Sequence, residues 1–409
     1  VPNRRHSDAH NLDPGSSIHA YRRLRAAGAR IWHPRRGRAF MRRSVATMRW
    51  GRQTLWLAAM GIGLCALTAA ADMLHWRLGG WVLLGSFAIG TFCAFTAGRL
   101  ASLADQSVAL PVILIAAAAM RLALLFSEPT LSSDIYRYIW DGRVQASGTN
   151  PYRYVPAASE LVPLRDPDIW AHINRAGHVT IYPPVAQSVF FAVTRFGESV
   201  VTMKIGLLLF EAVGVAAIIA LLQQLGKPAT HVAAYAWHPL PIWEVAGNGH
   251  VDAVMCTFLL LGLLVCLGGR TLLAGVVVSL GALVKPTALL ALPVFWRPWR
   301  IWLPLLFLAT IALLYAPYLA VGWKVLGFLP AYVAEEGLDK GYGFRLVMIV
   351  YQIFGVVPYL DIPVQHVATD VLRAMRRGTQ WLYANRAGAS AIAAREISMP
   401  RRASISDCR

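Results

Sequence analysis

Long apolar stretches are the feature that most restricts how this chain can fold. Five of them approach the roughly 20 residues that an α-helix needs to cross a bilayer, and they lie at 54–73, 81–98, 107–126, 201–225 and 301–320. Across the whole chain 56% of the residues are hydrophobic and only 15% are charged, whereas soluble domains average about 25% charged residues. The sequence therefore predicts an all-α, polytopic membrane protein.

Shorter apolar segments extend this topology. They lie at 232–246, 253–268, 271–284, 287–296 and 346–360. Together with the longer stretches they predict about ten transmembrane helices, and they make residues 127–198 a long loop on the outer side of the membrane. The stretch 271–296 leaves the count open, because one kinked span or a re-entrant pair also fits it.

Positive charge is concentrated at the two ends of the chain. The formal net charge is +18, and residues 1–52 contain 13 arginines against two aspartates, while residues 373–409 contain eight arginines against two acidic residues. This distribution is typical of cytoplasmic termini under the positive-inside rule. It argues against a nucleic-acid partner, because neither end offers a folded scaffold to present the charge.

The chain therefore divides into three parts. We predict a basic, disordered cytoplasmic arm at 1–52, a transmembrane core at 53–360 and a basic cytoplasmic tail at 361–409. The core would place the protein in the cell (inner) membrane as a multi-pass protein in contact with membrane lipids, with both termini cytoplasmic.

The segment after the third span carries charged and aromatic residues in a regular pattern. It reads SSDIYRYIWDGRVQASGTNPYRY, residues 132–154. In a helix over 134–147, four side chains would share one face because they are spaced i, i+3, i+4 and i+7: Asp134, Arg137, Tyr138 and Asp141. We expect an interfacial helix on the outer membrane surface, with its carboxylates toward a cavity. An ordinary surface helix kept soluble by its Asp–Arg pairs is the alternative.

Two further groups of polar residues lie within apolar surroundings. In GNGHVDAV, His250 and Asp252 would lie on the outer face near Glu244, where they could bind a divalent cation, orient sugar hydroxyls or only form a turn. Their spacing matches no strong metal signature, so we expect no metal and no cofactor. Glu211 lies in the middle of an apolar span, where an ionisable group is costly, and we expect a structural ion pair with Arg121.

Four segments of the sequence together resemble the GT-C superfamily of integral-membrane glycosyltransferases. They are SSDIYRYIWDGRVQASGTNPYRY, INRAGHVTIYPPVAQ, AWHPLPIWEVAGNGHVDAVM and GALVKPTALLALPVF, and the similarity runs from about residue 54 to 360. The resemblance is strongest to bacterial members that use polyprenyl-phosphate sugars, often mannose. It implies inverting transfer of mannose or another hexose to a glycan or lipid acceptor on the outer face. A lipid-linked sugar flippase or transporter is the alternative function.

The resemblance also implies roles for individual residues. An aspartate at the start of the first large outer loop is the catalytic base in that family, and the matching residue is Asp134, with Asp141 as the second candidate. Lys285, before the helix-breaking Pro286, would neutralise the departing phosphate unless it only snorkels to the interface. The remaining expected substrate-binding residues are Arg137, Tyr138, His178, Tyr182, His250, Asp252 and, as a second phosphate ligand, Arg345.

Overall fold

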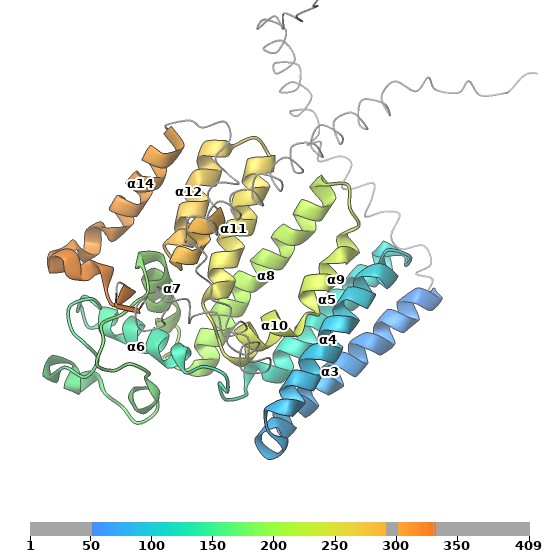
Figure 1. Cartoon of the computed structure of the whole chain (residues 1–409), viewed down its shortest axis with the longest axis horizontal. Coiled ribbons are helices and arrows are strands. Elements are labelled where there is room, and N and C mark those ends of the chain that lie inside the picture. The colour runs from blue at the N-terminus through green and yellow to red at the C-terminus, as the bar shows by residue number, and fades with distance from the viewer. Residues whose placement is uncertain (1–50, 292–301, 330, 333–409) are drawn as a thin grey trace, which may run out of the picture. The chain divides into compact units, whose positions relative to one another are not determined.

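The computed structural model of the chain describes residues 51–291, 302–329 and 331–332, and within these ranges all regular structure is helical. Five of the described segments are long and apolar enough to cross a membrane (Figure 1). Four are single helices: α3 (Arg52–Leu78), α4 (Gly80–Ala101), α5 (Gln106–Leu125) and α8 (Val200–Gln224). The fifth, Pro304–Leu326, runs through α14 (Trp302–Tyr315) and the 3₁₀ segment η6 (Ala316–Leu326). The predicted all-α, multi-pass membrane class is confirmed. The total of ten helices is not, and the predicted span 346–360 lies outside the described residues.

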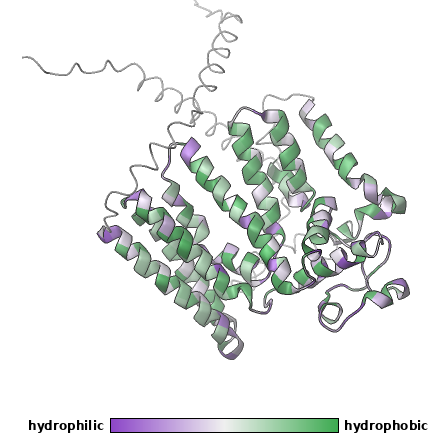
Figure 2. Ribbon diagram, turned by 180° about the vertical axis from the view of Figure 1, so that it is seen from behind, coloured by the Kyte–Doolittle hydropathy of each residue, from purple (hydrophilic) through white to green (hydrophobic). Residues whose placement is uncertain are grey.

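Helices α3, α4 and α5 pack together through small side chains. The buried residues of α4 recur every three to four positions and are all small: Ser86, Gly90, Ala94, Ala97 and Ala101. Small side chains let helices approach closely where the lipid removes the usual hydrophobic driving force between them. The opposite faces of these helices keep large apolar side chains exposed, and Figure 2 shows hydrophobic residues along the helices and hydrophilic residues in the connections.

The segment predicted as a span at 232–246 is broken into short pieces. It consists of η3 (Ala229–Val232), α9 (Ala233–Ala236), α10 (Pro239–Pro241) and the π-helical η4 (Ile242–Gly247). The two prolines at the ends of α10 each lack a backbone N–H and so interrupt a continuous helix. A neighbouring helix satisfies part of the backbone of this segment, because Arg121 Nη1 of α5 donates to the Ala236 carbonyl at 2.9 Å, as irregular backbone at membrane depth requires.

Two shorter apolar helices follow. α11 (Asp252–Leu267) and α12 (Thr271–Ala282) pack side by side, and each is shorter than a full span. The 3₁₀ segment η5 (Pro286–Ala291) then begins at the proline predicted to break the helix. The described part of 271–296 is therefore interrupted before Pro286, and residues 292–296 lie outside the described ranges.

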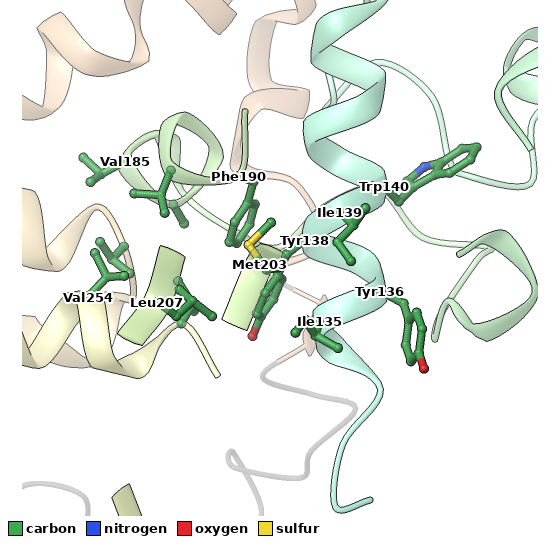
Figure 3. Close-up of a cluster of buried hydrophobic side chains, with 14 of the residues drawn as sticks. Ile135, Tyr136, Tyr138, Ile139, Trp140, Val185, Phe190, Met203, Leu207 and Val254 are labelled. Atoms are coloured by element: carbon green, nitrogen blue, oxygen red, sulfur yellow. The ribbon is translucent and has the colours of Figure 1, made fainter. Parts of the chain in front are cut away.

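The long loop 127–198 contains most of its regular structure near its ends. Its elements are α6 (Asp134–Ala146), η1 (Ser159–Leu164), η2 (Trp170–His172) and α7 (Pro184–Thr194). α6 packs against α7 and the start of α8. Figure 3 shows Tyr138 on the side of α6 that faces Met203 and Leu207 of α8, while Tyr136 and Trp140 project from the other side.

α6 forms where the sequence predicts a helix, and it is buried on nearly all sides. Every residue from Ile135 to Gly142 is buried, including Arg137 and Asp141. The loop covers the polar face of α6, and the hydrophobic cluster of Figure 3 covers the opposite face. Its interfacial position is not confirmed, because it is enclosed by protein on both sides.

The ends of several helical segments lie beside this loop. Ser127, after α5, donates to Asp72 of α3 at 2.6 Å, and the backbone N–H of Phe328, after η6, donates to the Thr180 carbonyl at 3.1 Å. The ends of α3, α5 and η6 therefore lie at the same end of the bundle as α6, where α8 begins.

Candidate functional site

The first turn of α6 holds a partly exposed carboxylate. Asp134 Oδ1 accepts a hydrogen bond from Asn174 Nδ2 at 2.5 Å, and its backbone N–H donates to Ser132 Oγ at 3.2 Å. Within the described residues no hydrogen bond reaches Oδ2. The positive end of the helix dipole favours a negative charge at this position. Asp134 therefore has one carboxylate oxygen in a protein hydrogen bond and one without such a bond among the described residues.

The turn of the GNGH sequence packs directly against this helix start. Gly249 has φ 68°, and a Cβ there would collide with the side chain of Ile135, so only glycine fits this approach. The preceding Asn248 is fully buried, and its Oδ1 accepts from the backbone N–H groups of Thr130 and Leu131 at 3.0 and 2.8 Å. The turn is thus tied to the chain just before Asp134.

His250, the next residue, forms an ion pair. Its Nδ1 lies 2.6 Å from Glu244 Oε2, while its Nε2 is buried without a hydrogen-bond partner among the described residues. Burial alone would lower the pKa of His250, but the hydrogen bond and charge of Glu244 and the charges of Asp134 and Asp252 outweigh it and raise that pKa. Asp134, Asp252 and Glu244 therefore all lie within electrostatic reach of one imidazole.

The second pair links α11 to the turn after α12. Lys285 Nζ contacts both carboxylate oxygens of Asp252, at 2.9 and 2.8 Å. The two side chains are 41% and 38% exposed, so a ligand can reach them. No group of three His, Cys, Asp or Glu side chains within the described residues is placed to hold a metal ion.

Arg137 and Asp141 pair with each other in the interior. Arg137 Nε donates to Asp141 Oδ1 at 2.9 Å, and the two residues are 5% and 1% exposed. Asp141 Oδ2 also accepts from Thr180 Oγ1 at 2.5 Å and from Gln187 Nε2 at 2.9 Å. The structure thus separates the two predicted carboxylates: Asp134 is accessible, and Asp141 is enclosed by protein donors.

The predicted aromatic and histidine ligands occupy different environments. Tyr138 is 1% exposed and stacks on Phe190, with ring centroids 4.5 Å apart, and its burial raises the pKa of its hydroxyl. Tyr182 meets Tyr138 edge-on at 4.9 Å. The exposed His178 turns its ring to Phe328, with centroids 4.1 Å apart. Arg345 lies outside the described residues.

The ion pair predicted within the membrane-spanning helices is present. Arg121 donates to both oxygens of Glu211, from Nη2 at 2.6 Å and from Nε at 2.8 Å. Its Nη1 also donates to the carbonyls of Ala117 and Ala236 at 3.0 and 2.9 Å, and Tyr235 donates its hydroxyl to Glu211 at 3.2 Å. The prediction of a structural pair is confirmed.

Sequence reasoning missed two polar residues near the site. Lys204 is fully buried in α8, and its Nζ donates to the carbonyls of Leu124 and Ser127 at the end of α5, at 3.2 and 2.6 Å. Lys204 could have been found from the sequence, because it is an ionisable residue within an apolar span, as Glu211 is. Asn174 stands in a loop, and no local pattern there indicated that it would contact Asp134.

The arrangement brings together groups of complementary chemistry. An accessible carboxylate, a half-exposed lysine and an imidazole gather at one end of the bundle, where the apolar helices end. A carboxylate within reach of a hydroxyl can act as a general base. A cation beside it can stabilise a leaving phosphate.

Comparison with known proteins identifies the family of the chain. A family model described as Alpha-(1->6)-mannopyranosyltransferase, N-terminal domain, matches residues 35–300. Alpha-(1->6)-mannopyranosyltransferase A of Mycobacterium tuberculosis is 27% identical over 176 residues, which cover 42% of this chain and 33% of that protein, so the chain spans about one third of this relative's length. No solved structure matches. Because the family model covers more than half of the chain and includes α6, α11 and α12, the chain belongs to the alpha-(1->6)-mannopyranosyltransferase family, as its GT-C-like motifs predicted.

Proposed function

We propose that the protein transfers mannose from a polyprenyl-phosphate donor to a glycan or lipid acceptor on the outer face of the membrane, with inversion at the anomeric carbon. The family supports mannose transfer. The observation that carries the finer proposal is the position of Asp134, an accessible carboxylate in the first turn after a membrane-spanning helix. A sugar attached to a lipid phosphate must react at that depth, where the lipid headgroup lies.

In this mechanism Asp134 acts as the general base. Asn174 engages Oδ1, and Oδ2 accepts the proton of the acceptor hydroxyl as its oxygen attacks the anomeric carbon. The bond from that carbon to the phosphate oxygen breaks on the opposite side, so the configuration inverts. The products are the mannosylated acceptor and the polyprenyl phosphate.

Lys285 stabilises the departing phosphate. Its Nζ donates to both carboxylate oxygens of Asp252, and that contact holds the ammonium group at the surface beside α11. A phosphate oxygen can take up a charge-assisted hydrogen bond from the same group. The reaction requires no metal ion, because the lysine supplies the positive charge, and we expect a chelator to leave the rate unchanged.

A flippase or transporter is less well supported by the geometry. Such proteins bind their substrate near the bilayer midplane, between broken helices. The described protein does contain a broken segment at 229–247, but Arg121 and Glu211 satisfy each other beside it. The partly exposed charged side chains of the candidate site, Asp134, Asp252 and Lys285, lie instead at one end of the bundle.

The test is an assay of the purified protein in lipid nanodiscs with labelled mannosyl polyprenyl phosphate and a mixture of glycan and lipid acceptors. We expect label in an acceptor, release of polyprenyl phosphate and an anomeric configuration opposite to that of the donor. A parallel reaction with a nucleotide-activated mannose should give no product. In sealed proteoliposomes, movement of intact donor across the bilayer without cleavage would instead establish the flippase.

A further inference from the structure

The loop 174–180 crosses the polar face of α6 and contacts it over about two turns. At one end, Asn174 Nδ2 donates to Asp134 Oδ1 at 2.5 Å. At the other end, Thr180 Oγ1 donates to Asp141 Oδ2, also at 2.5 Å. The side chains at i, i+3 and i+7 of α6 therefore all bind one continuous loop.

Arg137 fixes the middle of this loop. Its Nη1 donates to the His178 carbonyl at 3.1 Å and to the Arg175 carbonyl at 3.5 Å, while its Nε pairs with Asp141. A buried charge that loses its partners is costly, by several kcal/mol. Because both Arg137 and Asp141 are buried and fully engaged, the loop has one strongly favoured position on α6.

The backbone of the loop is shaped to present Asn174. Arg175 adopts φ 49°, which a non-glycine residue rarely takes without support from its surroundings. At the next residue, the Ala176 carbonyl accepts from the backbone N–H of Ala157 at 2.9 Å. The turn is thus held from the α6 side by Arg137 and from the opposite side by the segment at Ala157.

From these contacts we propose that Asn174 is a positioning residue for the transfer reaction. It holds Oδ1 of Asp134 so that Oδ2 faces the acceptor hydroxyl, and Arg137 and Asp141 hold the loop that carries it. The proposal rests on the assignment of Asp134 as the base. It gives a role to the polar face of α6, and it explains why Asp141 stays buried while Asp134 does not.

Two substitutions at one position test it in the nanodisc assay. Asn174→Ala removes the donor and should lower kcat on the order of tenfold or more, because small misplacements of a reacting group are costly, with the donor KM unchanged. Asn174→Asp keeps the shape but sets a second carboxylate against Asp134. Two adjacent carboxylates raise each other's pKa, so the acid limb of the kcat/KM profile should move to higher pH.

The controls separate this role from a merely structural one. Asp168→Ala changes an exposed residue elsewhere in the long loop 127–198, and it should leave both kcat and the pH profile as in the wild type. Thermal midpoints of the Asn174 variants should match the wild type, since a structural role would lower them without moving the pH limb. If Asn174→Ala fails to fold, the position of the acid limb in the kcat/KM profile of Asn174→Asp is the measurement that tests the proposal.

Two results would overturn the proposal. Wild-type kcat in Asn174→Ala, together with an inactive Asp134→Asn, would refute the role of Asn174 and leave the base assignment standing. An unshifted acid limb in Asn174→Asp would refute it as well. Wild-type rates in Asp134→Asn would instead overturn the proposed base itself, so the two failures are distinguishable.

Discussion

The three aspartates of α6 and α11 are each held by a different kind of partner. Asp134 accepts from a neutral amide, Asp141 from an arginine and two neutral donors inside the protein, and Asp252 from a half-exposed lysine. Of these three, only Asp134 combines partial exposure with an oxygen that accepts no hydrogen bond from the described residues. This difference in surroundings, rather than the residue type, is the basis of the proposed roles.

Lys285 is the residue whose removal should weaken donor binding or slow transfer. Lys285→Ala should lower kcat/KM for the donor about tenfold or more, since a hydrogen bond to a charged group contributes about 1.5–3 kcal/mol. Kinetics at varied donor concentration measure this. Lys227→Ala, an exposed lysine after α8, is the matched control and should leave kcat/KM unchanged. Equal kcat/KM values in the two variants would reduce Lys285 to a snorkelling residue.

The pair of His250 and Glu244 should make stability depend on pH. The folded protein raises the pKa of His250 above its ordinary value near 6.5, so protonation favours the folded state. This contribution is fully present below about pH 6.5 and is lost as the pH rises through the folded-state pKa. Thermal unfolding in detergent between pH 5 and 9 should show a loss of stability over that range in the wild type.

Glu244→Gln should flatten this dependence, because the uncharged amide no longer favours the imidazolium. Glu160→Gln, an exposed change in the outer loop, should retain the wild-type dependence. An identical slope in all three proteins would show that another group is responsible.

At the scale of the helices, the broken segment 229–247 depends on a buried ion pair. Arg121 donates to its Ala236 carbonyl as well as to Glu211, so the pair links α5, α8 and the segment. Glu211→Gln should lower the free energy of unfolding by about 3 kcal/mol, because it leaves a mostly buried guanidinium without its countercharge. Thermal unfolding in detergent measures the change.

The double variant Arg121→Met with Glu211→Leu provides the comparison. Removing both charges avoids the uncompensated arginine, so the double variant should be more stable than Glu211→Gln. If the double variant is the less stable of the two, the pair contributes more than charge compensation and its hydrogen bonds to the backbone dominate.

The sequence predicted individual helices better than their environments. Periodicity located α6 to within one residue at its end, and the length of apolar stretches located α3, α4, α5 and α8. The sequence could not show that the loop 174–180 would cover the polar face of α6, because the contact of Asn174 with Asp134 joins residues 40 positions apart. Pro239 and Pro241 indicate a break within 232–246, but the prediction of a span there was based on hydropathy alone.

The same limit applies to the candidate site. Asp134, His250, Asp252 and Lys285 could be named from their motifs, and the structure gathers them near one end of the bundle. Glu244 and His250 belong to one motif, but the contacts of Asp134 with Asn174 and of Asp252 with Lys285 could not be predicted, because these partners come from separate segments.

At the scale of the whole molecule, the account requires the loop 127–198 to face outward and the connections after α8 and α11 to face the cytoplasm. A cysteine at Ser159 should react with an impermeant thiol reagent in intact cells, and one at Lys227 should not, both in a background without the native cysteines. Both positions are exposed, so accessibility to the reagent depends on the side of the membrane. The reverse labelling would invert the topology and place the site on the cytoplasmic face.

The central claim is that Asp134 is the base in a mannosyl transfer from a polyprenyl phosphate. The most direct test compares wild type, Asp134→Asn and the exposed control Asp168→Asn in the nanodisc assay with labelled donor. Asp134→Asn preserves size but removes the basic oxygen, so we predict a loss of rate on the order of 100-fold or more, an unchanged thermal midpoint, and wild-type rates in Asp168→Asn. Near-normal transfer by Asp134→Asn would contradict the account, and an inactive Asp141→Asn beside it would assign the base to Asp141.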